Sequence, residues 1–456
     1  MTTEFDAIVI GAGPAGEVCA GRLGEHGLSV AVFEGHLVGG ECSYYACMPS
    51  KALLRPDQAV AEARRIPGAA EAITGELDVE AVLRRRDEVV HNLDDSVQVP
   101  WLEARNVTLV RGNARLSGER AVELDGTTYT ARRAVVIATG TGPSLPPIPG
   151  LAEAHGWTNR QGTTSHHVPR RLVVLGGGVA GVELGQAWLT LGSEIAIIEG
   201  GPRLIAREEE FASRFVHDAL AARGVEIHTG SRAMSVERDE REVRVTLEGG
   251  SVVSGDEILV AVGRTPATRE IGLETVGLEP GRYVEVDETL RVAGRDWLYA
   301  IGDVNGRALL THMGKYQGRI AADVIVGRPA RIDPRSDGAV SPRVVFTEPQ
   351  VAAVGYTLAG AQEAGLDVRA VDFETSGTAG GSFYGRGAPG TSRLVVDEQR
   401  RILVGATFCG AEVSEWLHAA TIAVVAELSI DTLWHAVPCF PTRSEVWLRL
   451  FEEYGL

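Results

Sequence analysis

The chain has 456 residues, of which 44% are hydrophobic and 23% charged, a composition typical of globular proteins, and its length predicts about three domains. The formal net charge of -17 argues against nucleic acid or an anionic membrane as a partner. No apolar run approaches the length of a membrane span, no signal peptide precedes the first strand, and five cysteines do not make a secreted disulfide framework. We therefore expect a cytoplasmic protein.

The first predicted unit is a strand, a glycine loop, a helix and a second strand that ends in an acid. A strand is expected over residues 6–10, which are apolar after Asp6, and the loop Gly11–Gly16 follows. A helix is expected to about Glu25, and a strand over 28–33 ends at Glu34. The glycines let the backbone approach a pyrophosphate and let the helix pack on the strand, while the helix N-terminus holds phosphate charge. Glu34 would accept hydrogen bonds from ribose hydroxyls.

Two cysteines, Cys42 and Cys47, follow this unit in the run Gly39–Lys51. Pro49 is expected to open a helix, because proline is tolerated in a first turn. A thiol at a helix entrance feels the positive end of the dipole, so Cys47 is placed to hold a thiolate, with Cys42 close enough to form a disulfide with it. The alternatives are an inert disulfide or half of a zinc site. No second cysteine pair exists to complete a metal site, so no metal is predicted.

Residues 53–103 are expected to be mostly helical, and the run Arg84–Arg86 is expected to be a solvated helix face. A buried strand is predicted over residues 134–140, ending in Ala138-Thr139-Gly140. The proline-rich residues 143–149 indicate a crossing between domains.

The strand–glycine–helix–strand–acid unit then recurs. A strand over 172–175 precedes the loop Gly176–Gly181, and a strand over 195–198 ends at Glu199. The first glycine and the acid are 23 residues apart in both copies, since 34 − 11 and 199 − 176 are equal. One glycine fingerprint is weak, but two copies in the correct context predict two dinucleotide sites.

The remaining segments complete the predicted fold class. A strand over 258–262 followed by Gly263–Pro266 closes the second nucleotide unit, and a strand over 298–301 followed by Gly302-Asp303 returns to the first. From about residue 341, strands and helices mix without a nucleotide fingerprint. We predict an α/β fold with two Rossmann-like dinucleotide-binding domains and a C-terminal α+β domain.

With these motifs, the chain resembles the class I pyridine nucleotide–disulfide oxidoreductases, the family of dihydrolipoyl dehydrogenase, glutathione reductase and mercuric reductase. The resemblance covers essentially the whole length and also rests on Phe346–Pro349 and Pro441–Glu445. It implies an FAD domain over residues 1–150 and 276–340, an NAD(P) domain over 151–275 and a dimerisation domain over 341–456. It also implies a homodimer whose active sites are completed by the partner subunit.

The resemblance implies roles for individual residues. Cys47 matches the thiol beside the flavin, Cys42 the interchange thiol that attacks substrate, Lys51 the lysine beside flavin N5, and Glu183 the ion-pair partner of that lysine. The positions implied to bind FAD are Gly11, Gly13, Gly16, Glu34, Gly40, Ala114, Thr139, Gly140, Asp303 and Thr311. Those implied to bind the nicotinamide cofactor are Gly176, Gly178, Gly181, Glu199 and Gly263.

Glu199 is implied to select the nicotinamide cofactor, because a carboxylate pairs with a free ribose diol and would repel a 2′-phosphate. Relatives that use NADPH tend to carry arginine nearby, and Arg203 and Arg207 lie downstream here. NADH is favoured, with NADPH as the alternative.

The chain departs from the family at Phe440, which stands where the disulfide reductases carry their acid–base histidine, although Glu445 keeps its place. Phenylalanine cannot transfer a proton. The alternatives for the missing base are water, Tyr44 or Tyr45, and His435.

Other members of the family also lack this histidine. Phe440 resembles the ketopropyl-coenzyme M carboxylase branch, although that branch has a histidine where this chain has Glu445. Mercuric reductases usually end in a cysteine pair, which this chain lacks. Cys439 is expected to be a small buried residue, with a third functional thiol as the alternative.

The sequence therefore predicts an enzyme that passes electrons from NADH through FAD to the Cys42–Cys47 disulfide and on to a small-molecule or protein disulfide, as in dihydrolipoyl dehydrogenase. One alternative is a diaphorase, quinone reductase or metal-ion reductase of the mercuric reductase kind. Another is a thiol enzyme like the ketopropyl-coenzyme M carboxylase. A flavoprotein sensor without activity is disfavoured by the intact cysteines and nucleotide motifs.

Overall fold

The structure is a computed structural model that describes residues 3–385, 387–388 and 390–456. The chain divides into two compact units. The first contains residues 1–49, 87–143 and 264–338, and the second contains residues 50–86, 144–263 and 339–456. Within the described residues, no helix combines the length and the apolar character needed to cross a membrane.

A seven-stranded sheet forms the centre of the first unit. Its strands, in spatial order, are β3 (Val107–Arg111), β2 (Val30–Glu34), β1 (Glu4–Ile10), β6 (Thr127–Ile137), β5 (Ala121–Leu124) and β4 (Arg115–Gly118), with β16 (Leu298–Ala300) also paired to β6. Strands β3, β2, β1, β6 and β16 run parallel. Residues Ala7, Ile8 and Val9 of β1 are fully buried, as expected for a parallel strand covered on both faces.

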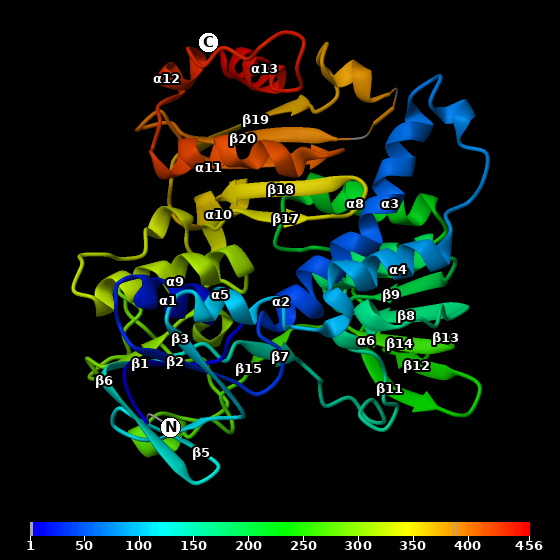
Figure 1. The fold of residues 1–456 in the computed structure, drawn as a ribbon. Helices are drawn as coiled ribbons and strands as arrows, with labels where there is room; N and C mark the ends of the chain where they lie inside the picture. The colour runs from blue at the N-terminus through cyan, green and yellow to red at the C-terminus, as the bar shows by residue number, and fades with distance from the viewer. Residues whose placement is uncertain (1–2, 386, 389) are drawn as a thin grey trace. The chain divides into compact units, whose positions relative to one another are not determined.

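Helices α1 (Pro14–Glu25) and α9 (Thr311–Ile325) pack against each other and share a core with this sheet (Figure 1). Two glycines permit the close approach. A Cβ atom on Gly318 would lie 2.7 Å from the carbonyl oxygen of Ala15, and one on Gly314 would lie 3.3 Å from the Ala15 Cβ. This packing brings the start of α9 beside the first glycine loop.

The first unit also contains several short elements. They are α2 (Gly40–Tyr44), α5 (Val99–Glu103), β7 (Thr141–Pro143), β15 (Arg264–Pro266) and the 3-10 turns η2 (His91–Leu93), η3 (Leu273–Val276), η4 (Gly302–Asn305) and η5 (Pro334–Ser336). Strands β7 and β15 pair antiparallel.

The second unit contains a four-stranded parallel sheet and a three-stranded antiparallel sheet. The parallel sheet has the order β10 (Glu226–His228), β9 (Glu194–Ile198), β8 (Arg171–Leu175) and β14 (Glu257–Val260). The antiparallel sheet consists of β11 (Ala233–Arg238), β12 (Val243–Leu247) and β13 (Val252–Gly255). The helices of this part are α4 (Val79–Val89), α6 (Asn159–Thr164), α7 (Val179–Thr190) and α8 (Glu210–Ala222), with a 3-10 turn at η1 (Ala70–Ala72).

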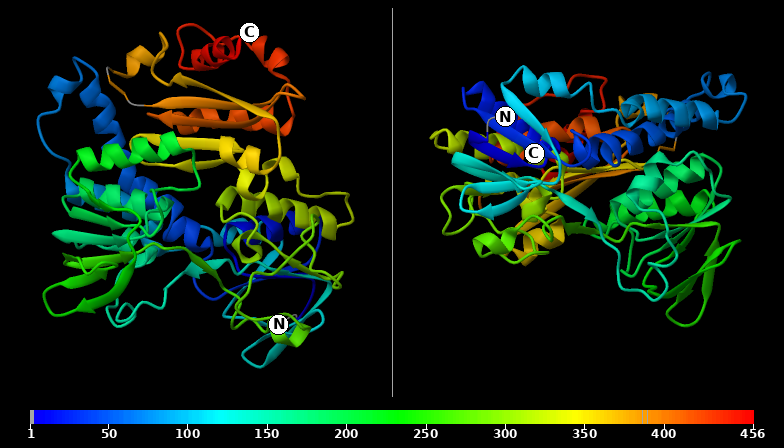
Figure 2. Two further views of the ribbon diagram at one scale, coloured as in Figure 1. Left: turned by 180° about the vertical axis from the view of Figure 1, so that it is seen from behind. Right: turned by 60° about the horizontal axis from the view of Figure 1, so that its bottom comes forward.

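The C-terminal part of the second unit is a five-stranded antiparallel sheet covered by helices. Its order is β17 (Arg343–Val345), β18 (Gln350–Gly355), β21 (Ile402–Gly410), β20 (Thr391–Asp397) and β19 (Val368–Glu374). Its helices are α10 (Leu358–Glu363), α11 (Leu417–Val425), α12 (Ile430–Trp434) and α13 (Glu445–Tyr454), with 3-10 turns at η6 (Gly338–Val340), η7 (Gly381–Tyr384) and η8 (Val413–Trp416). Helices α11 and α13, orange and red in Figure 2, pack against the sheet around Phe408 and Phe451.

Helix α3 (Cys47–Arg65) begins two residues earlier than predicted. Pro49 is therefore its third residue instead of its first. This position still tolerates proline, because the first N–H groups of a helix have no partner within the helix.

The expectation of a solvated arginine face over 84–86 is wrong at Arg86. Arg84 and Arg85 are exposed, but Arg86 is 0% exposed. Its guanidinium donates to the main-chain oxygens of Thr163 (2.6 Å) and Ser165 (3.2 Å) at the end of α6. The last carbonyl groups of a helix lack partners within it, and Arg86 supplies donors for them.

Candidate functional site

The first glycine loop has the geometry of a phosphate-binding turn. Gly11 has φ +101°, and a Cβ there would collide with the carbonyl oxygen of Ala138. A Cβ on Gly16 would collide with the carbonyl oxygen of Gly11, so α1 packs directly on the loop. A Cβ on Gly13 would meet nothing within 4 Å, and α1 begins at the next residue. Open space at a helix N-terminus fits a bound anionic group.

The second glycine loop repeats this geometry. Gly176 has φ +112°, and a Cβ there would collide with the carbonyl oxygen of Ala261. A Cβ on Gly181 would collide with the carbonyl oxygen of Gly176, as at Gly16 in the first loop. A Cβ on Gly178 would also point into open space. The two predicted fingerprints are therefore alike in conformation as well as in spacing.

The acid that ends each predicted unit, Glu34 or Glu199, is hydrogen-bonded to the backbone of its own glycine loop. Glu34 Oε2 accepts a hydrogen bond from the Ala12 N–H at 2.8 Å, and Glu199 Oε2 accepts one from the Gly177 N–H at 2.6 Å. The Oε1 atom of each accepts a backbone N–H two residues further along the chain. A carboxylate oxygen has more than one acceptor site, so both acids retain capacity for ribose hydroxyls.

Several predicted FAD positions gather at the same edge of the first sheet. Thr139 and Gly140 follow β6, and Asp303 follows the paired strand β16. Asp303 Oδ2 accepts a hydrogen bond from Thr141 Oγ1 at 2.8 Å, and burial raises the pKa of Asp303. Within the described residues, the buried Thr139 Oγ1 has no hydrogen-bond partner. This unpaired hydroxyl beside a glycine cradle fits a bound dinucleotide.

The other cofactor positions of the prediction lie at element ends. Gly40 begins α2, Thr311 begins α9, and Ala114 is buried shortly after β3. Gly263 has φ +144° and follows β14 in the second unit. These four positions complete the description of the residues that the sequence predicts to bind cofactors.

The two cysteines meet at the beginning of α3. Both are free thiols. Cys47 Sγ lies 3.3 Å from Thr311 Oγ1 at the start of α9. A hydrogen bond with Cys47, together with burial, raises the pKa of Cys42. The two cysteine side chains therefore lie within reach of each other at the start of α3.

Lys51 and Glu183 form a closely spaced ion pair in the second unit. Lys51 Nζ lies 2.6 Å from Glu183 Oε2, and Glu183 is only 3% exposed. Glu183 Oε1 accepts the Phe346 N–H at 2.8 Å, and the ammonium lies 4.7 Å from the centroid of the Phe346 ring. The buried charge of Glu183 is thus satisfied by two donors.

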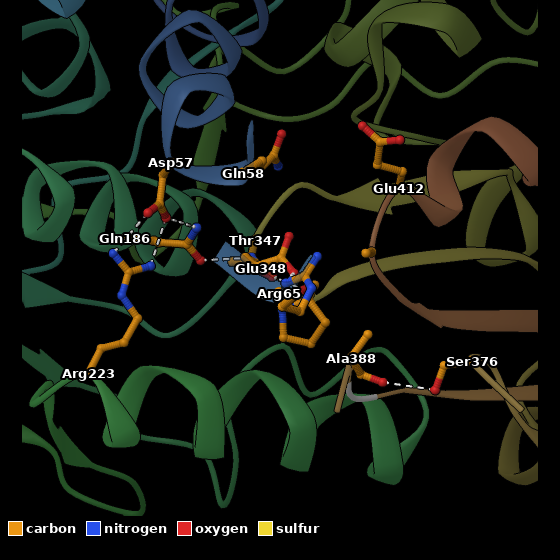
Figure 3. A network of polar contacts seen from close by, with 12 residues as sticks. Asp57, Gln58, Arg65, Gln186, Arg223, Thr347, Glu348, Ser376, Ala388 and Glu412 are labelled. Carbon is orange, nitrogen blue, oxygen red and sulfur yellow. Dashed lines mark hydrogen bonds and ion pairs between the residues drawn. The ribbon is translucent and has the colours of Figure 1, made fainter. Parts of the chain in front are cut away.

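A polar network that the sequence did not predict includes residues of the same two helices, α3 and α7, and Figure 3 shows its members pointing toward one another. Asp57 Oδ2 of α3 accepts hydrogen bonds from Gln186 Nε2 (2.9 Å) and Arg223 Nη1 (2.7 Å). Gln186 Oε1 accepts the Glu348 N–H at 2.9 Å, and Arg65 Nη1 binds Glu348 Oε1 at 2.8 Å. The network joins α3, α7, α8 and the segment 346–349. Its one signal in the sequence is Gln186, which follows Glu183 by three residues and so lies on the same face of α7.

The C-terminal signature segment presents Phe440 on the surface of the single chain, where it is 76% exposed. Glu445 is buried at the start of α13, and its Oε2 accepts the Gly380 N–H at 3.2 Å. The expectation that Cys439 is buried is wrong for the single chain, because the residue lies in an exposed loop before Pro441.

Arg203 lies close to Glu199 in sequence, but its guanidinium is hydrogen-bonded to main-chain carbonyl groups. Its Nη1 donates to the Glu208 carbonyl at 2.9 Å and its Nη2 to the Ala206 carbonyl at 2.8 Å. Arg207 is exposed. The guanidinium of Arg203 is thus occupied by its own loop.

Comparison with known proteins gives the family. A family model described as pyridine nucleotide-disulphide oxidoreductase matches residues 5–318, and the model of its dimerisation domain matches residues 341–450. The chain belongs to the pyridine nucleotide-disulphide oxidoreductase family. It is 34% identical to dihydrolipoyl dehydrogenase of Bacillus subtilis over 98% of this chain and 96% of that protein. It is 29% identical to mercuric reductase of Staphylococcus aureus over 97% of this chain and 81% of that protein.

Solved structures agree with this assignment. LpdA of Mycobacterium tuberculosis matches with 25% identity and a TM-score of 0.86, covering 99% of this chain and 100% of that one. The Cu(II) complex of the HOCl-induced flavoprotein disulfide reductase RclA of Escherichia coli matches with 25% identity and a TM-score of 0.85, covering 98% and 99%.

The predicted family, fold class and enzyme class are therefore confirmed. The protein is a flavin-dependent pyridine nucleotide–disulfide oxidoreductase that uses FAD and a pyridine nucleotide. Its dimerisation domain supports a homodimer.

Proposed function

We propose that the enzyme oxidises NADH and passes two electrons by way of FAD to the Cys42–Cys47 pair, and from there to a disulfide acceptor. The observation that carries this proposal is the interacting thiol pair beside Thr311, in the unit that also holds the first glycine loop and the unpaired Thr139 hydroxyl. Bound FAD would supply the two-electron step between nicotinamide and thiol chemistry.

In this proposal the chain's own residues carry out thiol–disulfide exchange. The Cys42 thiolate attacks one sulfur of the acceptor disulfide, forms a mixed disulfide and releases the first acceptor thiolate. The Cys47 thiolate then attacks Cys42 Sγ, releases the second acceptor thiolate and closes the enzyme disulfide. Two protons from the medium convert the released thiolates to thiols. Glu183 holds the Lys51 ammonium in one position during the cycle.

We propose NADH over NADPH because Glu199 places a carboxylate at the end of β9, while Arg203 is held by carbonyl groups of its own loop. A carboxylate facing a 2′-phosphate costs on the order of 1 kcal/mol or more at a partly exposed site. Specificity constants measured with both cofactors test this assignment, and a preference for NADPH would contradict it.

The domain boundaries and the shared active site remain part of the proposal. We assign residues 1–150 and 276–340 to FAD binding, 151–275 to NADH binding and 341–456 to dimerisation. The match of the dimerisation model to 341–450 supports the last assignment. We further propose that Phe440 and Glu445 complete the active site of the partner subunit.

A metal-ion reductase is the second candidate. A metal ion that takes electrons from thiolates releases no thiol that must be protonated. The absence of a histidine at position 440 would therefore not slow this reaction. The similarity to a mercuric reductase, and to a reductase solved as a Cu(II) complex, favours this alternative.

The two candidates are separated by NADH oxidation rates with lipoamide, glutathione disulfide, a quinone, Hg(II) and Cu(II), on the wild-type enzyme and on Cys42→Ser. We expect reduction of a disulfide by the wild type and its loss in Cys42→Ser, with FAD absorbance unchanged as the control for folding. If disulfides are not reduced and quinone reduction survives the substitution, thiol exchange is not the activity.

A further inference from the structure

Arg232 lies beside Glu199 in the fold, although the two residues are far apart in the sequence. Glu199 directly follows β9, and Arg232 lies in the loop after β10. These strands run parallel with His228 opposite Ile198, so the segments that follow them leave the sheet at the same edge. Ligands of such sheets bind beyond the carboxyl ends of the strands. Both segments therefore border the proposed site of the nicotinamide cofactor.

Main-chain hydrogen bonds hold the two segments against each other. The Glu199 N–H donates to the His228 carbonyl at 2.8 Å, and the Ser231 N–H donates to the Glu199 carbonyl at 3.0 Å. The Gly230 N–H donates to the Gly201 carbonyl at 2.7 Å. The backbone that leads away from β10 is thus fixed on the loop that carries the carboxylate.

The side chain of Arg232 covers the open side of this loop. Apart from its chain neighbours, a Cβ atom on Gly200 would meet one atom within 4 Å, the Cγ of Arg232 at 3.6 Å. The Arg232 carbonyl accepts the Glu248 N–H at 2.8 Å, which holds the residue from the other direction. Its side chain is exposed, and among the residues that the structure describes its guanidinium has no hydrogen bond or ion pair.

The charges at this edge favour an anion more than the sequence alone indicates. Both carboxylate oxygens of Glu199 already accept short hydrogen bonds, from the N–H groups of Gly177 and Gly201 at 2.6 Å each. Arg203 is bound to its own loop, so Arg232 is the arginine that keeps its donors for a ligand. Arginine binds phosphate groups through charge-assisted and often bidentate hydrogen bonds.

We propose that Arg232 is a specificity-determining residue that binds the 2′-phosphate of NADPH, so that NADPH serves as a second electron donor beside NADH. The inference rests on the proposed function, because it takes the second glycine loop as the site of the nicotinamide cofactor. NADH has a hydroxyl group in place of this phosphate. Arg232 therefore narrows the preference for NADH that the carboxylate of Glu199 creates.

The test measures binding of two nucleotides and needs no turnover. Adenosine 2′,5′-bisphosphate and adenosine 5′-monophosphate differ only in the 2′-phosphate. Isothermal titration calorimetry on the oxidised holoenzyme gives both dissociation constants, and their ratio isolates the contribution of that phosphate. The proteins are the wild type, Arg232→Met, Arg232→Lys and Arg207→Met. Arg207 is the matched control, because it is an exposed arginine downstream of the same acid.

We expect Arg232→Met to weaken binding of the bisphosphate relative to the monophosphate by about fivefold to twentyfold, as loss of a charge-assisted hydrogen bond at an exposed site should. Arg232→Lys keeps the charge but not the planar fork, so it should retain part of the wild-type ratio. Arg207→Met should retain all of it. A ratio for Arg232→Met within about twofold of wild type overturns the proposal, as does an equal or larger change in Arg207→Met.

Reduction of the bound FAD by NADH and by NADPH separates this proposal from the proposed function. If the ratio depends on Arg232 but neither cofactor reduces the flavin, the proposed function fails while the phosphate contact stands. If NADH reduces the flavin and the ratio does not depend on Arg232, the proposed function stands and the role of Arg232 is refuted. Where both hold, Arg232→Met should lower kcat/KM for NADPH relative to NADH by the factor seen in binding.

Discussion

At the residue scale, our proposal places Phe440 where relatives carry an acid–base histidine, a group that typically contributes about 10²–10⁴-fold to rate. Glu445 is still present and buried, with Oε2 accepting the Gly380 N–H. We predict that Phe440→His restores part of this factor in disulfide reduction. The gain should follow a titration near pH 6.5, the usual pKa of histidine.

The control for that substitution is Phe440→Leu, which changes the side chain without adding a base and should leave the rate near wild type. Turnover with a disulfide acceptor is measured across pH 5 to 9. A Phe440→His enzyme that is no faster than Phe440→Leu would mean that the site serves a reaction other than thiol exchange.

Glu17 gives a second prediction at the residue scale, concerning stability. Its pKa is raised from 4.5 to about 7, first by burial. The folded protein therefore binds this proton more tightly than the unfolded chain, and the free energy of unfolding falls as pH rises from about 4.5 to about 7. The Gln98 amide, oriented so that both of its ends are satisfied, donates to Glu17 Oε1 at 2.7 Å. Glu17→Gln keeps this acceptor oxygen and removes the titration. Relative to wild type, it should gain about 1–3 kcal/mol of stability over this interval.

Denaturant unfolding of the holoenzyme at pH 5 and pH 8 measures this difference. Glu103→Gln, an exposed acid on α5, is the matched control and should show no such pH-dependent gain. A Glu17→Gln variant that loses stability on going from pH 5 to pH 8, relative to wild type, would contradict the assignment.

At the scale of elements, helix α4 shows how one arginine can hold two helices together. Arg86 satisfies the carbonyl groups of Thr163 and Ser165, whereas Arg84 makes an exposed pair with Glu80. We predict that Arg86→Met lowers the free energy of unfolding by about 1–3 kcal/mol, because buried acceptors lose their donor. Arg84→Met, the matched control, should change it by no more than about 0.5 kcal/mol. Equal effects in denaturant unfolding would contradict this account.

The elements around the glycine loops could be predicted from sequence, because local patterns determine them. Apolar strand residues, glycines whose Cβ atoms would collide with neighbouring backbone, and acids at strand ends all lie within a few dozen residues of one another. Arg86 follows the buried Val82 and Leu83 by four and three residues, so it lies on the same buried face of the helix. This spacing predicts burial of Arg86, but the run of three arginines favoured an exposed face instead.

Other parts of the site could not be predicted, because they depend on contacts between distant segments. The network of Asp57, Gln186 and Glu348 joins residues up to 291 positions apart, since 348 − 57 is 291. The contact between Cys47 and Thr311 joins residues 264 positions apart. No periodicity within either segment reports such a contact.

For the whole molecule, the two family matches describe a redox part and a dimerisation part of one enzyme. The central claim is that the Cys42–Cys47 pair carries electrons between FAD and the acceptor. It predicts that the reduced pair leaves the Cys47 thiolate beside oxidised flavin, since thiols at a helix entrance favour the thiolate.

Anaerobic titration of the holoenzyme with NADH tests this claim most directly. After two electron equivalents, we expect a long-wavelength charge-transfer absorbance that is present in wild type and absent in Cys47→Ser. Direct bleaching of the flavin in wild type, with no such absorbance and with Cys42 still protected from iodoacetamide, would contradict the account.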